Sequence, residues 1–492
     1  MIASRWTTLV AALALAGPAA AASASDASVV ADPPGWADGD ADAMLEGLVG
    51  VVERDPGGPL GQAALAAARH LWDDAKDPAP LVRRLEALLA RGAARGDTDE
   101  MIRRTLGDRY LESGEDAKRA AVGVDAGYLG DFLVAGPFGV PADAALDVPY
   151  PPESGIDLEK EMQGRRGPLR WMRYRNLGVG EIVEPFQYLR PTDGVAFALA
   201  QVRSAKERPA VLKVTCLASH KILLNGAEVL RADRLREVRG RTSWTPVTLA
   251  AGWNRVLVKV VGSQGVMVKV CDAETGLPLE GVEVEKGAVL HPAVPALPAP
   301  ETAGYRSNLE RLLASDPADP AERAVRGMLA AYYDLPWIAY TDLERAAKEA
   351  PRSPGVVLRF AQFVQQFGEM PEPRWRKNRA RALYEDVLEA SPGHVEAVVE
   401  LARILNGEDR TEEALAGLKE LAAPPKEGTL SPGAAQAAAE SRAAMERSRG
   451  LFPGLDALLE RRPGLRERDF SQAFAAPSSS PFFRRISPMS RG

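Results

Sequence analysis

Two cysteines and four histidines are the residues of this sequence best suited to nucleophilic or metal chemistry. A catalytic thiolate needs a nearby histidine as its base, and neither Cys216 nor Cys271 has a histidine at a recognisable spacing. The histidines are scattered singly and show no metal-ligand spacing; they are His70, His220, His291 and His394. No phosphate-cradling glycine loop and no serine elbow is present. We therefore predict no catalytic residue, no metal, no cofactor and no enzyme activity.

Apolar residues in the second half of the chain recur with the period of stacked helix pairs. The residues Ala380, Tyr384 and Val387 have counterparts 34 residues later. A third segment upstream has the same internal spacing, and Gly327 precedes it where a small residue lets two helices approach closely. The counterparts are Ala414, Leu418 and Leu421 downstream, and Ala339, Leu343 and Ala346 upstream. A period of 34 is typical of an α-solenoid, in which each helix pair buries its apolar face on the next.

Residues 304–425 resemble the tetratricopeptide repeat family on the strength of this spacing, although Val398 and Ala402 depart from the common pattern. The resemblance implies three to four repeats whose first helices line a concave face that holds a protein or peptide. In that register the partner-binding residues would be Arg359, Gln362, Gln366, Glu396, Glu400 and Arg403. The alternative is that these residues form an ordinary solvated helix face.

Between residues 128 and 287 the pattern changes from helical to alternating. Short apolar runs such as 195–202, 211–217 and 256–261 are typical of strands, and Asn225-Gly226 predicts a two-residue hairpin turn with positive φ at both positions. Several short strands separated by turn residues predict an antiparallel β-sandwich.

The segments 222–229 and 249–260 resemble the galactose-binding-like jelly roll. Together with Ala135-Gly136-Pro137-Phe138, they resemble more closely the sandwich that opens secreted bacterial proteins built of a sandwich, a tetratricopeptide array and a transglutaminase-like domain. The chain has no cysteine after Cys271, so the nucleophile of such a domain is missing. The resemblance implies carbohydrate as an alternative ligand, with Trp171 and Tyr174 as the contacts at a sheet rim.

The first residues indicate export. Arg5 precedes an apolar run over residues 9–16, and small residues near 20–24 offer a cleavage site, which is the layout of a secretory signal peptide. The run is too short to span a bilayer. We expect a bacterial periplasmic or secreted protein without a transmembrane segment. An oxidising compartment permits a disulfide between Cys216 and Cys271, but both lie in strand-like runs where a free cysteine can serve as a small core residue.

The predicted fold class is multidomain α + β: an N-terminal helical segment, an antiparallel jelly-roll-like β-sandwich and a C-terminal tetratricopeptide α-solenoid. The formal net charge of −6 argues against a nucleic-acid partner. We expect an exported, non-enzymatic scaffold that binds protein or peptide; the alternatives are a polysaccharide-binding protein, or the non-catalytic part of a transglutaminase-like enzyme. The predicted segments are a signal peptide (1–24), a linker (25–40), a helical domain (41–123), a sandwich (128–287), a proline-rich linker (288–303), helical repeats (304–460) and a disordered tail (461–492).

Overall fold

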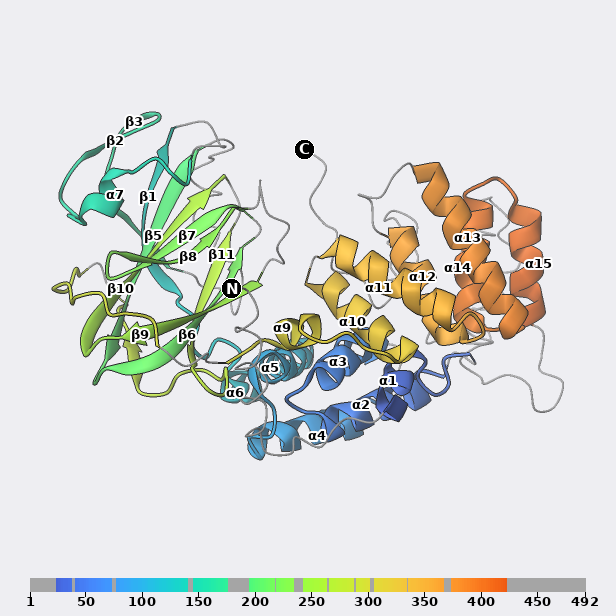
Figure 1. The fold of residues 1–492 in the computed structure, drawn as a ribbon. Helices are drawn as coiled ribbons and strands as arrows, with labels where there is room; N and C mark the ends of the chain where they lie inside the picture. Colours follow the sequence, from blue (N-terminus) through green and yellow to red (C-terminus); the bar gives the residue numbers. More distant parts are fainter. Residues whose placement is uncertain are drawn as a thin grey trace, which may run out of the picture.

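The structure is a computed structural model. It describes residues 24–37, 40–72, 77–139, 145–175, 194–216, 218–233, 242–262, 265–286, 289–300, 305–333, 335–366 and 373–422. The predicted signal peptide before residue 24, the last part of the predicted repeats and the predicted tail lie outside these ranges. Within them, no helix combines the length and the apolar character needed to cross a bilayer. Strands gather on one side of the molecule and helices on the other (Figure 1).

The N-terminal helices bury their apolar residues against one another. Asp40 caps the first long helix by accepting a hydrogen bond from the Ala43 amide at 3.1 Å, which satisfies one of the free N–H groups of a helix start. The apolar stripe of that helix, including Leu45, Leu48 and Val52, is buried. These helices are α1 (Ala24–Ala31), α2 (Ala41–Arg54), α3 (Pro59–Leu71), α4 (Ala79–Ala90), α5 (Gly96–Glu112) and α6 (Asp116–Val122).

The middle of the chain forms two facing antiparallel sheets. The larger sheet has the order β4-β1-β5-β10-β7-β8, with β12 also paired to β5, and the smaller has the order β11-β6-β9. The strands are β1 (Asp131–Phe138), β4 (Met172–Arg175), β5 (Val195–Ser204), β6 (Arg208–Cys216), β7 (His220–Leu224), β8 (Ala227–Ala232), β9 (Thr242–Leu249), β10 (Gly252–Val261), β11 (Val266–Asp272) and β12 (Val282–Val284). A small ribbon of β2 (Met162–Gly164) and β3 (Gly167–Leu169) lies apart from both sheets, and α7 (Pro151–Ser154) precedes it. We call residues 128–286 the β domain.

Alternation along the strands builds a core between the two sheets. Val256, Val258 and Val260 of β10 share one buried cluster with Leu212 and Val214 of β6. The predicted hairpin is confirmed at β7 and β8, which pair with each other. Asn225 has φ of 52° and Gly226 has φ of 90°, the backbone conformation that a type I′ turn requires.

The C-terminal helices pack as antiparallel neighbours. Proline begins several of them, a position where the missing N–H has no intrahelical partner to lose. Gly327 is confirmed as a close approach, because a Cβ there would lie 2.7 Å from Leu343 Cγ in the next helix. The helices are α9 (Asn308–Leu313), α10 (Pro320–Tyr332), α11 (Pro336–Glu349), α12 (Pro354–Gln366), α13 (Pro373–Ala390), α14 (Val395–Asn406) and α15 (Thr411–Ala422).

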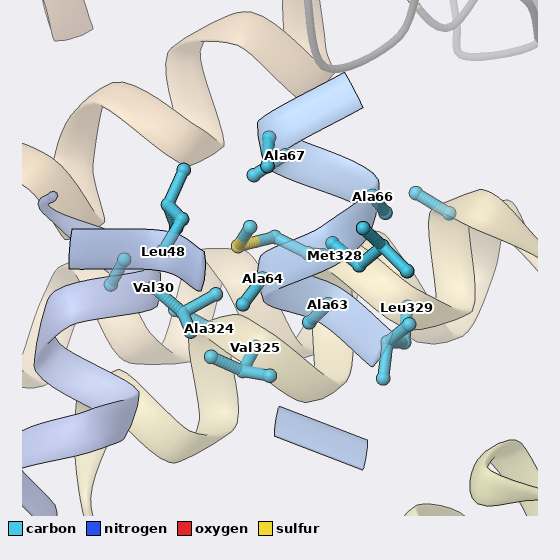
Figure 2. Close-up of a cluster of buried hydrophobic side chains, with 14 of the residues drawn as sticks. Val30, Leu48, Ala63, Ala64, Ala66, Ala67, Ala324, Val325, Met328 and Leu329 are labelled. Atoms are coloured by element: carbon cyan, nitrogen blue, oxygen red, sulfur yellow. The ribbon is translucent and has the colours of Figure 1, made fainter. Parts of the chain in front are cut away.

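The two helical segments form one body, whereas the sequence predicted two separate helical domains. Leu48 of α2 and Ala64 of α3 belong to the same buried cluster as Val325 and Met328 of α10, and Figure 2 shows these side chains meeting between the helices. The chain therefore leaves the helical body after α6, builds the β domain and returns to the same body at α9 (Figure 1). Periodicity could not reveal this, because each helix shows an apolar stripe whichever neighbour covers it.

The predicted linker over residues 25–40 is wrong. Residues 24–31 form α1, and Ala27, Val30, Ala31 and Trp36 are buried in the helical core. The alanine-rich composition supports a short helix, and tertiary packing rather than local sequence holds it in place.

The proline-rich segment after the β domain follows the surface of that domain. Gln201 donates a hydrogen bond to the Val289 carbonyl at 2.6 Å, and Thr248 donates one to the Pro298 carbonyl at 2.7 Å. His291 stacks on Trp253 with ring centroids 4.0 Å apart. The segment is thus attached to the sheets by its backbone over residues 289–300.

Candidate protein-interaction site

The six residues predicted to bind a partner lie on two neighbouring helices. Arg359, Gln362 and Gln366 are in α12, and Glu396, Glu400 and Arg403 are in α14. Residues spaced by three or four positions share one face of a helix, so the prediction placed both sets on facing stripes. We use the name α12–α14 face for this surface.

The side chains of the two stripes bond to one another. Gln362 donates a hydrogen bond to Glu396 at 3.3 Å, and Gln365 donates one to Glu400 at 2.9 Å. Arg403 forms an ion pair with Glu400. The face is therefore a connected polar network between α12 and α14.

Gln365 is a functional candidate that the sequence reasoning missed. Its Nε2 faces Glu400, and its Oε1 accepts a hydrogen bond from the hydroxyl of Tyr384 in α13. Gln365 lies three residues after Gln362 on the same helical stripe, so the helix period could have identified it. Gln366, chosen instead, is half-buried.

Burial corrects the expectation of an open groove. Glu400 and Gln362 are nearly inaccessible, whereas Arg403 is exposed. Arg359 is also buried, because the segment that contains α1 lies over it: its guanidinium donates hydrogen bonds at 3.2 Å to the carbonyls of Val30 and Ala31. Arg403, Gln366 and the partly exposed Glu396 remain available to a partner.

Burial also shifts the protonation of this face. It raises the pKa of Glu396 to about 7, and the neighbouring Glu400 carboxylate adds to the effect. Burial lowers the pKa of Arg359 to about 9. It lowers the pKa of His394, beside the start of α14, to about 4. A charged Glu396 is therefore disfavoured in the folded protein at neutral pH, where the unfolded chain would carry that charge freely.

Replacing Glu396 with glutamine should stabilise the protein above neutral pH. The pKa of the carboxyl is near 4.5 in the unfolded chain and near 7 in the folded protein. The folded state therefore holds the proton more tightly than the unfolded state, and the protein loses stability as pH rises from 4.5 to 7. We expect Glu396→Gln to raise the free energy of unfolding by about 1 to 3 kcal/mol at about pH 8, and to change it little below about pH 4.5.

Denaturant melts of wild type and Glu396→Gln across this range test the prediction. His394 acts in the opposite direction, because its neutral form stabilises the fold above pH 6.5 and that contribution is lost as pH falls toward 4. His394 is present in both proteins, so its contribution cancels in the difference between their free energies of unfolding. A difference that does not vary with pH would show that Glu396 titrates normally.

The two aromatic residues proposed to contact carbohydrate do not form an open platform. Trp171 is 9% exposed and lies in a buried cluster on the outer side of the larger sheet, with Phe138, Tyr150 and Phe197. Tyr174 packs against the core between the sheets. Trp171 directly precedes the edge strand β4, but the expected exposure of its ring is wrong, because the segment carrying α7 and β2 folds over that side of the sheet.

The cysteines are not bridged. Both are buried thiols, Cys216 between the two sheets and Cys271 on the opposite side of the smaller sheet. Burial raises the pKa of Cys271 to about 12, so it is a thiol at neutral pH. Cys216 and His220 both bond to the Ala218 carbonyl, at 3.6 and 2.8 Å, but neither side chain is accessible.

The two remaining histidines are His70 and His291. His291 lies 2.5 Å from Glu285, and the side chain of His70 in α3 is outside the described part. Across the residues that the structure describes, no group of three or more histidine, cysteine, aspartate or glutamate side chains could hold a metal ion.

A buried ion cluster, unforeseen from the sequence, joins α5 to the outer face of the smaller sheet. Lys213 lies 2.9 Å from Asp97 and 3.0 Å from Glu100, and Lys269 lies 3.2 Å from Glu100. The Tyr128 hydroxyl donates a further hydrogen bond to Glu100 at 2.7 Å. Although desolvation opposes ionisation, the two lysines hold the pKa of Glu100 well below its usual range. This cluster fixes the β domain against the helical body.

One family model matches the chain: residues 378–427 match the tetratricopeptide repeat. They include most of α13, all of α14 and all of α15. No curated protein matches the chain.

Solved structures give only distant similarities. One named "MamA MSR-1 C2" is 19% identical over 32% of this chain and 87% of its own length, with a TM-score of 0.25. A β-glucosidase from Kluyveromyces marxianus in complex with glucose is 14% identical over 29% of this chain and 16% of its own length, with a TM-score of 0.19. Similarities this weak carry no conclusion about function.

Proposed function

We propose that this chain, whose residues 378–427 match the tetratricopeptide repeat, is an exported, non-enzymatic scaffold that binds a protein segment on the α12–α14 face. The observation that carries the proposal is the polar network on that face, which lies within and beside the matched repeat. Stacked helix pairs of this type form a solenoid with a concave binding surface. The ionisable groups within reach of a partner there are Arg403 and Glu396.

Export is proposed from the sequence alone. It rests on the arginine, apolar run and small-residue site at the start of the chain. Intact-mass analysis of protein isolated from the periplasm should show a start near Ser23 or Ser25. A retained Met1 would contradict it.

The proposal that the protein is not an enzyme rests on the state of its nucleophiles. Both thiols are buried, and the pKa of Cys271 is raised to about 12. A catalytic cysteine instead requires a lowered pKa and access to substrate. The β domain then serves as a rigid second module attached through the buried ion cluster.

Polysaccharide binding by the β domain is the weaker candidate. We keep the galactose-binding-like jelly roll as the proposed fold of that domain, supported by its two facing antiparallel sheets. Its aromatic candidate Trp171 is buried, and a sugar-stacking ring must be exposed. On the α12–α14 face, Arg403 is exposed and Glu396 is partly exposed.

Reversing the charge of Arg403 tests the binding face. The Arg403 side chain is 40% exposed and pairs with Glu400, three residues before it. Arg410 lies beyond the end of α14; its side chain is 42% exposed and pairs with Glu413, three residues after it. Arg403→Glu should weaken partner binding roughly tenfold or more, since hydrogen bonds to charged groups contribute about 1.5 to 3 kcal/mol. Arg410→Glu, whose glutamate partner is exposed whereas Glu400 is buried, is the control for the charge reversal itself and should leave affinity unchanged.

Glu400 is too buried to serve as a second reversed charge, because its reversal would disturb the fold. The neutral pair Glu400→Gln with Arg403→Gln removes both charges and leaves no buried ion unpaired. It should weaken the partner while preserving the melting temperature. If Arg403→Glu binds the partner as tightly as wild type while Arg410→Glu loses affinity for it, the binding site lies elsewhere.

A further inference from the structure

Residues 24–37, which we call the N-terminal strap, occupy one end of the α12–α14 face. Helix α1 packs against α10 and α12, and the side chains of Ala27, Val30, Ala31 and Trp36 are buried. Asp26 adds an ion pair to Arg54 of α2 at 2.6 Å. The strap therefore lies mainly against α10, α2 and α3, and it reaches the α12–α14 face through α12 and the start of α14.

Three hydrogen bonds and one cation–π contact hold the strap. Arg359 donates to the carbonyls of Val30 and Ala31, which are among the C=O groups that the end of a helix leaves free. Its guanidinium also lies 3.9 Å from the centre of the Trp36 ring, a favourable cation–π arrangement. The backbone of Val395, at the start of α14, donates to the Ala37 carbonyl at 3.0 Å.

Two glycines make room for the strap. A Cβ on Gly355 of α12 would lie 2.3 Å from the Cβ of Asp32, and a Cβ on Gly47 of α2 would lie 2.8 Å from Pro34 Cδ. Both glycines lie within helices, where alanine is intrinsically preferred by about 1 kcal/mol. Close approach of the strap explains glycine at these two positions.

Docking of the strap is opposed by electrostatic terms. The docked strap helps to bury Arg359, and this burial lowers the pKa of Arg359. Burial also raises the pKa of Asp32 in the strap. In both groups burial disfavours the charged form. The buried ring nitrogens of His394, next to Trp36, have no hydrogen-bond partner among the described residues. Apolar burial therefore works against the desolvation of polar groups, which brings the docked and undocked states closer in free energy.

We propose that the N-terminal strap is a displaceable occupant of this site, and that a partner peptide of the same chemistry takes its place. Such a peptide carries a short helix of small residues with free C-terminal carbonyls, followed by a tryptophan. This inference rests on the proposed function, because it assigns the partner of that face. Helix α1 has eight residues, too short to persist alone, so the released strap becomes unfolded chain.

Hydrogen exchange of the full-length protein measures strap opening directly. In wild type, the amides of residues 24–37 should exchange through an opening that leaves α10 and α13 protected. Gly355→Ala should speed that exchange at least roughly tenfold through its clash with Asp32. Gly417→Ala is the matched control, since its Cβ would make only a 3.6 Å contact with Val398. If the strap amides exchange only when the amides of α10 also exchange, the strap is a permanent part of the core.

A labelled peptide with the sequence of residues 24–37 tests exchangeability. Trp36→Ala weakens the protein's own strap and leaves the site intact, so the peptide should bind this variant roughly tenfold tighter than wild type. Adding Gly355→Ala, or replacing the tryptophan of the peptide with alanine, should abolish binding. No binding to Trp36→Ala, or a wild-type dimer that exchanges straps between copies, would overturn the assignment of a partner peptide.

These measurements require no natural partner, so they separate the inference from the proposed function. If the strap opens and the peptide binds while Arg403→Glu leaves partner affinity unchanged, the proposed partner face is wrong and the strap site stands. If the strap never opens yet Arg403→Glu weakens the partner, the face is correct and the strap is structural. If Trp36→Ala fails to fold, exchange in wild type and Gly355→Ala decides the question.

Discussion

Replacing Glu100 with alanine should destabilise the protein by roughly 3 to 5 kcal/mol, because removing one member of a buried ion cluster leaves the opposite charges unpaired. Glu100 bonds to both Lys213 and Lys269, which are nearly inaccessible. The variant would leave Lys269 without its carboxylate and Lys213 with Asp97 alone. Differential scanning calorimetry and denaturant titration should show this loss.

Glu283→Ala is the control for that measurement. Glu283 forms an ion pair with Arg203 at 3.3 Å within the β domain, but both side chains are more than half exposed. Exposed pairs contribute about 0 to 1 kcal/mol, so the control should melt close to wild type. Equal melting of Glu100→Ala and Glu283→Ala would mean that water reaches the cluster and that it does not hold the β domain in place.

Replacing Tyr384 with alanine should also destabilise the protein by roughly 3 to 5 kcal/mol, the range for removing a buried aromatic ring. Tyr384 is fully buried in α13, and its hydroxyl donates to Gln365 of the α12–α14 face. Tyr384→Phe keeps the ring and removes the hydrogen bond, so it should lose only about 0.5 to 1.5 kcal/mol. Thermal and chemical melts give both numbers.

Trp337→Ala is the matched control for the ring. Trp337 lies in α11 with 57% of its surface exposed, so its loss should change stability by no more than about 0.5 kcal/mol. A melting temperature of Tyr384→Ala equal to that of Trp337→Ala would show that the repeat register is wrong.

Local pattern explains which parts of the structure the sequence could predict. The apolar residues Ala380, Tyr384 and Val387 are all buried in α13, and the family match covers them. The Asn225-Gly226 turn was predictable because only positive φ at both positions closes a two-residue hairpin of this kind. Both signals depend on neighbours within a few residues.

Long-range packing explains what the sequence could not predict. The strap reads as a polar linker, yet Arg359, far along the chain, bonds to its carbonyls. Lys213 and Lys269 lie on strands, where a charged residue normally faces water, and they are buried because α5 brings Glu100 to them. In both cases the partner is distant in sequence and leaves no periodic signal.

The facing arrangement of the two polar stripes was predictable from the sequence, but their accessibility was not. The helical period placed Gln362 and Glu396 on facing stripes, as the structure has them. It could not indicate that Glu400 and Arg359 are covered, because burial depends on neighbouring helices and on the strap. A polar stripe in a sequence therefore identifies a face without identifying which of its residues a partner can reach.

Site-specific photo-crosslinking in the native cell is the most direct test that a protein partner binds the α12–α14 face. A photoreactive side chain is placed singly at Arg403, at Arg410 beyond the face and at Arg203 of the β domain, whose side chains are all exposed. We expect one discrete partner adduct from position 403 and none from 410 or 203. An adduct from position 203 with none from 403 would contradict the account and assign recognition to the β domain.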